Sequence, residues 1–68
     1  MNDETLNLSI RSFLKMVGIN SQRAIEQAVA KAIVEGTIAD TQSLPAKMVL
    51  TIPQLALAVE FEGAIKLE

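Results

Sequence analysis

The sequence contains no cysteine and no histidine among its 68 residues. The lack of cysteine excludes a disulfide framework, and a zinc, haem or iron–sulfur site is not expected, because such sites use cysteine or histidine ligands. The chain also lacks the side chains that most often serve as general base or nucleophile. We therefore expect no metal, no cofactor, no catalytic residue and no enzymatic activity.

Aromatic and basic side chains are also scarce. The chain has no tryptophan or tyrosine and only two phenylalanines, and its formal net charge is −2. Nucleic-acid binding is not favoured, because it usually requires a basic patch and side chains on which bases stack. No apolar run approaches the roughly 18 residues of a membrane span, and residues 1–4 are acidic where a secretory signal is basic. We expect a cytoplasmic protein.

Aliphatic side chains are what the sequence has in excess. Hydrophobic residues make up 50% of the chain, and very few of them are aromatic. A folded chain of this size buries only about 60% of the surface that its unfolded form exposes, so it is marginally stable alone. Small proteins usually gain the missing stability from disulfides, metals or oligomerisation. Since the first two are not expected, the composition favours a homodimer.

Two helices are predicted in the first half of the chain, over residues 3–17 and 22–35. Gly18 is a suitable left-handed residue to end the first helix, and Gly36 is a suitable one to end the second. Ser21 can cap the start of the second helix. The connection is short, so the helices should form a helical hairpin. The apolar stripes are Leu6, Ile10, Phe13, Leu14 and Val17 in the first helix, and Ile25, Ala28, Val29, Ala32 and Ile33 in the second.

A second interpretation of this half is a divergent helix-turn-helix. Gly18 would lie in the turn, and Gln22 and Arg23 would contact bases from the start of the second helix. Three positions do not fit: Leu14 stands where a small residue is expected, and Ala24 and Gln27 stand where larger apolar residues are expected. The negative net charge is also unfavourable, so a plain helical hairpin is the preferred interpretation.

The second half of the chain predicts an antiparallel β-hairpin over residues 46–68, after a polar linker over 37–45. In the first strand, 46–52, the residues Met48, Leu50 and Ile52 lie on one face, and in the second strand, 55–67, the large apolar residues occupy odd positions. This period of two is typical of strands with one buried face. Pro53 and the residue after it separate the two strands.

Two registers of this hairpin bring the apolar faces together. A two-residue loop pairs Ile52 with Leu55, and a four-residue loop pairs Ile52 with Leu57. The common two-residue turns need a positive φ at their first central position, which Pro53 cannot adopt. The four-residue loop is therefore favoured, and it sets Lys47 opposite an acidic residue, Glu62.

The second strand is long for such a small protein. Residues 55–68 would span about 43 Å when extended, and the first strand is used up near residues 61–63, so the tail has no partner within the chain. Gly63 interrupts the apolar face, and a glycine within a strand often marks a bulge or a bend. We therefore predict a homodimer, formed by edge pairing or by exchange of these strands. The predicted interface residues are Phe61, Gly63, Ile65 and Leu67.

Several short segments resemble a family of small, uncharacterised bacterial proteins of unknown function. They are Phe13-Leu14-Lys15, Val17-Gly18-Ile19, Ser21-Gln22-Arg23, Ile25-Glu26, Leu44-Pro45-Ala46-Lys47-Met48, Leu50-Thr51-Ile52-Pro53 and Glu62-Gly63. The resemblance covers nearly the whole chain. It implies a cytoplasmic bacterial protein and brings no activity, cofactor or catalytic residue with it.

These observations predict one small α+β domain over residues 1–68. A helical hairpin, 3–35, is expected to pack its stripes on the apolar face of the β-hairpin, which a second copy completes. The favoured function is a dimeric protein-interaction or assembly module without catalytic activity. The alternative is a small nucleic-acid-binding regulator that uses the helical hairpin, with Gln22 and Arg23 as the contacts.

Overall fold

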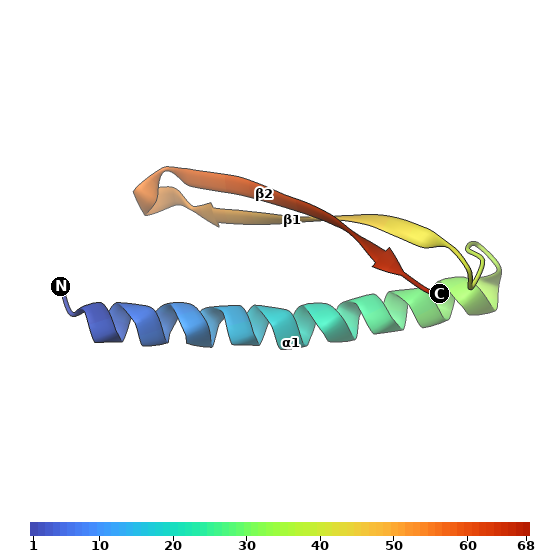
Figure 1. The fold of residues 1–68 in the computed structure, drawn as a ribbon, viewed down its shortest axis with the longest axis horizontal. Coiled ribbons are helices and arrows are strands. Elements are labelled where there is room, and N and C mark those ends of the chain that lie inside the picture. The colour runs from blue at the N-terminus through green and yellow to red at the C-terminus, as the bar shows by residue number, and fades with distance from the viewer. The chain divides into compact units, whose positions relative to one another are not determined.

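A computed structural model describes all 68 residues and confirms the α+β class (Figure 1). The elements in chain order are helix α1 (Asp3–Glu35), strand β1 (Ser43–Ile52), the short 3-10 helix η1 (Pro53–Leu55) and strand β2 (Leu57–Lys66). The chain divides into two units, the helical Met1–Thr37 and the hairpin Ile38–Glu68.

Helix α1 is a single continuous helix, so the prediction of two helices is wrong. It has 33 residues and is about 50 Å long at 1.5 Å per residue. Gly18 does not take a positive φ and does not end the helix. The side-chain amide of Asn20 donates to the carbonyl oxygen of Met16 at 2.8 Å, and Ser21 is an interior residue rather than a cap. A single interior glycine costs about 1 kcal/mol, which the helix-forming residues on either side outweigh.

The two predicted apolar stripes join into one stripe along α1. Leu6, Val17 and Ala28 follow one another at intervals of eleven residues, which is close to three turns, so they share a face. If a turn separated two helices, the two stripes would not need to lie on the same helical face. The spacing of Leu6, Val17 and Ala28 places both stripes on one face, and this is the sequence feature that indicates a continuous helix.

Asn2 caps the N-terminus of α1. Its side-chain oxygen accepts the backbone N–H of Thr5 at 3.0 Å, and this satisfies one of the four N–H groups that have no partner within the helix. Asp3 and Glu4 lie in the first turn, where the helix dipole favours negative charge. Asn2 is therefore the N-cap residue of α1.

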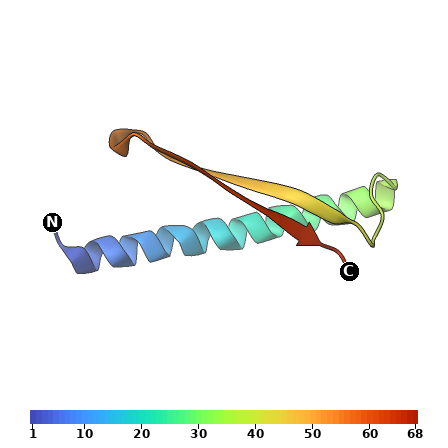
Figure 2. The ribbon, with the colours of Figure 1, turned by 45° about the horizontal axis from the view of Figure 1, so that its top comes forward.

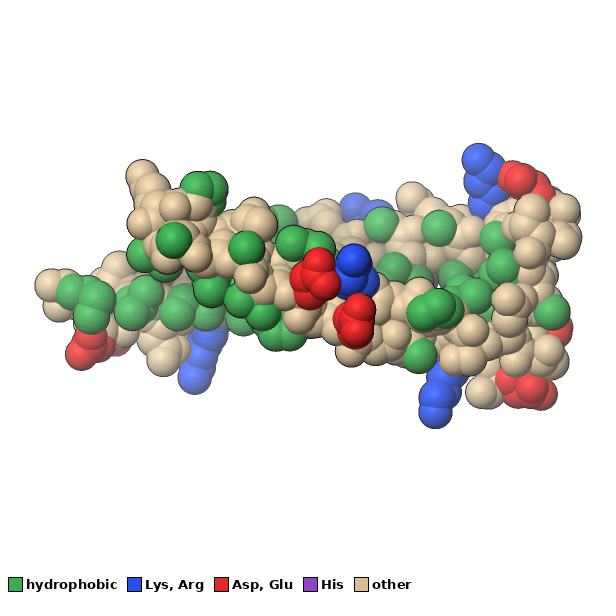
Figure 3. Space-filling view, turned by 90° about the horizontal axis from the view of Figure 1, so that it is seen from above, with side chains coloured by type: hydrophobic (Ala, Val, Ile, Leu, Met, Phe, Trp, Pro, Cys, Tyr) green, Lys and Arg blue, Asp and Glu red, His purple; other side chains and the backbone are tan.

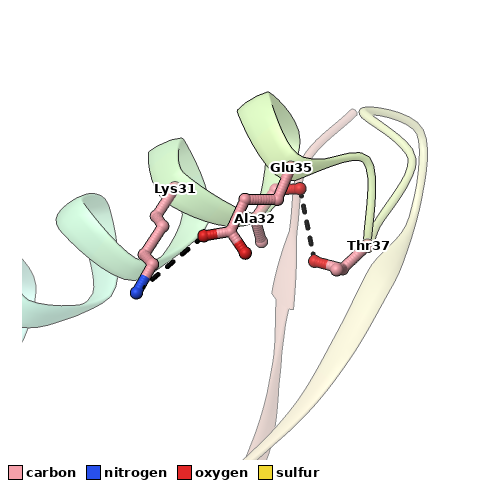
Figure 4. Close-up of polar contacts among 4 residues, drawn as sticks. All are labelled: Lys31, Ala32, Glu35 and Thr37. Carbon is pink, nitrogen blue, oxygen red and sulfur yellow. Dashed lines mark hydrogen bonds and ion pairs between the residues drawn. The ribbon is translucent and has the colours of Figure 1, made fainter.

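Gly36 ends the helix in the left-handed conformation, with φ 72°, as predicted. The backbone N–H of Thr37 donates to the carbonyl oxygen of Ala32 at 3.0 Å. In a Schellman motif, this is the hydrogen bond that spans the larger number of residues. The hydroxyl of Thr37 reaches the same oxygen at 3.3 Å (Figure 4). Figure 4 also shows the exposed ion pair between Lys31 and Glu35, whose charged atoms are 3.8 Å apart. Such surface pairs add little stability.

The β-hairpin has the register of the four-residue loop. Ile52 pairs with Leu57, Lys47 pairs with Glu62, and the pairing continues without a shift to Ser43 and the last residue of β2. This confirms the favoured register. The two strands coil about each other along their length (Figure 2), which is the normal twist of a two-stranded ribbon.

Strand β1 starts earlier than predicted and leaves no unpaired tail in β2. The predicted linker, 37–45, treated Pro45 as a non-strand residue, but Pro45 lies within β1 and pairs with Ala64. Both strands of a two-stranded sheet have an open edge, and a proline nitrogen that points to an open edge removes no ladder bond. Just beyond β2, the backbone N–H of Leu67 donates to the carbonyl oxygen of Gln42 at 3.2 Å. The end of β2 therefore has a partner within the chain. The dimer was predicted from an unpaired tail, and this premise is wrong.

Gly63 lies in regular strand. It pairs with Ala46 in the same register as its neighbours, and its φ is not positive. The predicted bulge or bend at Gly63 is wrong, because the ladder runs through this position without an extra residue.

Candidate interaction surface

One face of the hairpin is entirely apolar. Its cross-strand pairs are Leu44–Ile65, Ala46–Gly63, Met48–Phe61, Leu50–Val59 and Ile52–Leu57. Cross-strand pairs of this kind are the units that stabilise a sheet. None of these residues is buried, and 56% of the surface of Phe61 and 46% of that of Met48 are exposed. We call these ten residues the apolar face.

The opposite face of the hairpin carries its charges. The amine of Lys47 lies 3.7 Å from a carboxylate oxygen of Glu60, which is its diagonal neighbour across the strands, while Glu62 lies directly opposite Lys47. Figure 3 shows acidic and basic side chains next to one another near the middle of the view. Lys66, opposite Ser43, makes no ion pair.

The hydrogen bond beyond the end of the ladder shows which backbone groups face the open edges. Gln42 and Leu67 form the next pair of the hairpin register, and they are joined by a direct backbone bond. Hydrogen-bonded and non-hydrogen-bonded pairs alternate along an antiparallel ladder. Pro45 and Ala64, three positions further in, therefore form a non-hydrogen-bonded pair. The nitrogen of Pro45 faces the open edge of β1.

The open edge of β2 is defined by the same alternation. Backbone N–H and C=O groups that point away from β1 belong to the even-numbered residues of β2. They are Ala58, Glu60, Glu62, Ala64 and Lys66. None of them is proline, so this edge has a full set of donors and acceptors, whereas the edge of β1 lacks one donor at Pro45.

Helix α1 has no buried residue either. Val17 and Val29 on the stripe are half-buried, but most of its large apolar side chains are exposed. Large apolar side chains are also exposed away from the stripe, where Leu8 is 59% exposed and Ile19 is 51% exposed. Leu8 and Ile19 are eleven residues apart and so share a second face of the helix. Exposed apolar surface of this extent marks an interaction site more often than it marks solvent-facing surface.

The predicted interface residues lie on one side of the hairpin. Phe61, Gly63 and Ile65 belong to the apolar face, and Leu67 follows directly after β2. Nothing observed tests their role in a dimer, so it stays a prediction. The sequence reasoning did not show that the edge of β2 keeps all its donors while the edge of β1 lacks one; the signal for this was Pro45 within β1.

Gln22 and Arg23 lie in the interior of α1. The helix-turn-helix interpretation needs a turn before them, and this turn is absent because the helix continues through Gly18. Neither residue lies at a helix N-terminus, the position from which a recognition helix reads bases.

A shallow depression of about 350 Å³ is present on the hairpin, and its lining residues are Pro45, Ala46, Lys47, Glu62 and Gly63. The structure contains no group of three or more acidic, histidine or cysteine side chains arranged to hold a metal ion. Although α1 is long, no part of it is apolar enough to cross a membrane.

A protein-family model matches residues 1–68 of the chain. The chain belongs to DUF6494, a family of unknown function. This confirms the resemblance to an uncharacterised family, and the bacterial origin stays a prediction. No curated protein and no solved structure matches the chain.

Proposed function

We propose that the chain is a non-catalytic interaction module that works as a homodimer and presents its remaining apolar surface to another protein. The observation that carries the proposal is the absence of any buried side chain in a chain that is half hydrophobic. Sixteen large hydrophobic residues are exposed, and they occur on both the helix and the hairpin.

Neither unit has the means to be stable by itself. A two-stranded hairpin is marginally stable at best in water, because it needs a third strand or a packed helix. A helix gains most of its stability in proteins from packing its apolar face rather than from its own propensity. The chain has no cysteine for a disulfide. Association between copies is the proposed source of the remaining stability.

A second copy is the proposed partner because it brings an identical edge and identical faces. Most soluble oligomers are closed homo-oligomers, and two-fold dimers are the commonest kind. Within the hairpin, the open edge of β2 carries both acidic and basic residues, Glu60 and Lys66, which allows the same edge to be complementary to itself.

The test of this proposal is the mass of the protein in solution. Sedimentation equilibrium at about 0.1 mM chain should give the mass of two chains, and dilution should shift the species towards one chain. A mass of one chain over the whole concentration range would overturn the proposal. The cytoplasm is the proposed compartment, and cell fractionation with a tagged full chain tests it separately.

A further inference from the structure

We propose that β2 pairs antiparallel with β2 of a second copy, with the two-fold axis at Gly63, so that two hairpins form one four-stranded sheet. This inference rests on the proposed homodimer and specifies the edge and the register through which it forms. The dimer is isologous, since the same edge is used by both copies.

The edge follows from the position of the proline. Pro45 removes one donor from the open edge of β1, and prolines at edges are a common protection against strand addition. On the open edge of β2, no N–H or C=O group is missing from Ala58 to Lys66. Strand addition uses such unpaired backbone groups for affinity.

The register must keep the apolar faces on the same side of the sheet. Residues directly opposite each other in a sheet share a face, and a shift by one residue moves every side chain to the other face. The odd residues of β2 must therefore face odd residues of the partner. This places the two-fold axis at a residue of β2, rather than between two residues.

Among the possible axis positions, Gly63 gives the best pairing of charged side chains across the two strands. With the axis at Gly63, Glu60 faces the partner's Lys66, and the reciprocal contact is identical. Glu62 then faces the partner's Ala64, so no like charges are opposed. On the apolar face, Phe61 lies opposite the partner's Ile65. Opposite charges and aromatic–β-branched pairs are both favourable across strands.

Neighbouring axes are less favourable. An axis at Phe61 sets Glu60 directly opposite the partner's Glu62, and an axis at Glu62 sets that carboxylate opposite its own copy. An axis at Ala64 pairs Glu62 with the partner's Lys66, but it opposes Glu60 to the partner's Glu68 and shortens the overlap. Like charges directly opposite each other destabilise a sheet.

Gly63 also suits the axis sterically. It belongs to a hydrogen-bonded pair with Ala46, so it would form a non-hydrogen-bonded pair with its own copy, where Cα atoms are about 4.5 Å apart. A Cβ atom built at Gly63 meets no other atom within 4 Å. A cysteine at this position is therefore tolerated by the hairpin, and its sulfur would be within disulfide range of the partner's.

The experiment uses single cysteines in a chain that has none. Gly63→Cys, Glu62→Cys and Ala64→Cys are oxidised mildly at a concentration where the wild type is dimeric, and covalent dimer is measured on non-reducing gels. Val49→Cys, on the open edge of β1, is the control. Gly63→Cys should cross-link about tenfold faster than the other three, because only its separation fits a disulfide.

The outcomes separate this inference from the homodimer itself. A maximum at position 62, 64 or 49, or equal rates at all four, would overturn the edge or the register while a two-chain mass still supports the homodimer. A one-chain mass would remove both. In addition, Lys66→Glu should weaken association by about tenfold, since it replaces two attractive cross-strand pairs by repulsive ones. Lys15→Glu makes the same charge change on α1 and should leave association unaltered; equal effects of the two would also overturn the inference.

Discussion

The backbone N–H of Ala56 donates to the carbonyl oxygen of Pro53 at 3.0 Å and closes the hairpin turn. Ala56 has φ 52° and ψ 34° and is the only residue other than glycine with a positive φ. The left-handed region costs an L-residue about 1–2 kcal/mol. The turn therefore contains strain that a glycine would remove.

We expect Ala56→Gly to stabilise the protein by about 0.5–1 kcal/mol, because the relief of strain exceeds the added entropy of the unfolded chain. Ala58→Gly, two residues later in β2, should destabilise it, since a glycine in regular strand gains nothing. Urea unfolding at one fixed protein concentration measures both. Equal destabilisation by both substitutions would contradict a left-handed Ala56.

The continuity of α1 is tested at its two glycines. Gly18→Ala should stabilise the helix by about 1 kcal/mol, because alanine is the better residue in a helix interior and its Cβ meets no other atom within 4 Å. Gly36→Ala should destabilise the helix by a similar amount, because Gly36 has a positive φ. Thermal unfolding followed at 222 nm distinguishes the two. If Gly18 were a left-handed turn residue, both substitutions would destabilise.

The N-cap gives a third prediction. Asn2→Ala should cost about 1 kcal/mol, since it removes the acceptor for the Thr5 N–H. Asn7 lies in the helix and makes no side-chain hydrogen bond, so Asn7→Ala should be neutral or slightly stabilising. Circular dichroism and thermal unfolding of the two variants give the comparison. A loss at Asn7 equal to that at Asn2 would show that capping is not the cause.

The sequence determines the hairpin better than the helix, and the reason is physical. The parity of the apolar residues, together with Pro53, leaves one good register, and Ile52 does pair with Leu57. At Gly18, by contrast, local turn signals compete with the common phase of Leu6, Val17 and Ala28. A glycine both ends helices and is tolerated inside them at a small cost, so the residue type alone does not decide.

The limits of strand β1 show a similar competition. Pro45 indicates a break in most strands, yet it is harmless where its nitrogen faces an open edge. That orientation depends on which pairs of the ladder are hydrogen bonded, and no sequence pattern specifies this before the register is known. The prediction of the interface had the same weakness. It assumed that the end of the second strand has no partner, but β1 is longer than predicted and pairs with it.

Phe61 and Met48 offer a matched test of the proposed edge pairing. They lie opposite each other on the apolar face, so Phe61→Ala and Met48→Ala each delete the same contact within the hairpin. Only Phe61 is on the strand that faces the second copy, where it would lie opposite the partner's Ile65.

We therefore expect Phe61→Ala to weaken self-association about tenfold more than Met48→Ala, a difference of about 1.4 kcal/mol, which is in line with the burial of part of an aromatic side chain. Dissociation constants from sedimentation equilibrium measure this difference directly. Equal weakening by both substitutions would mean that the copies meet through the whole apolar face rather than through the edge of β2, because Met48 on β1 lies away from that edge.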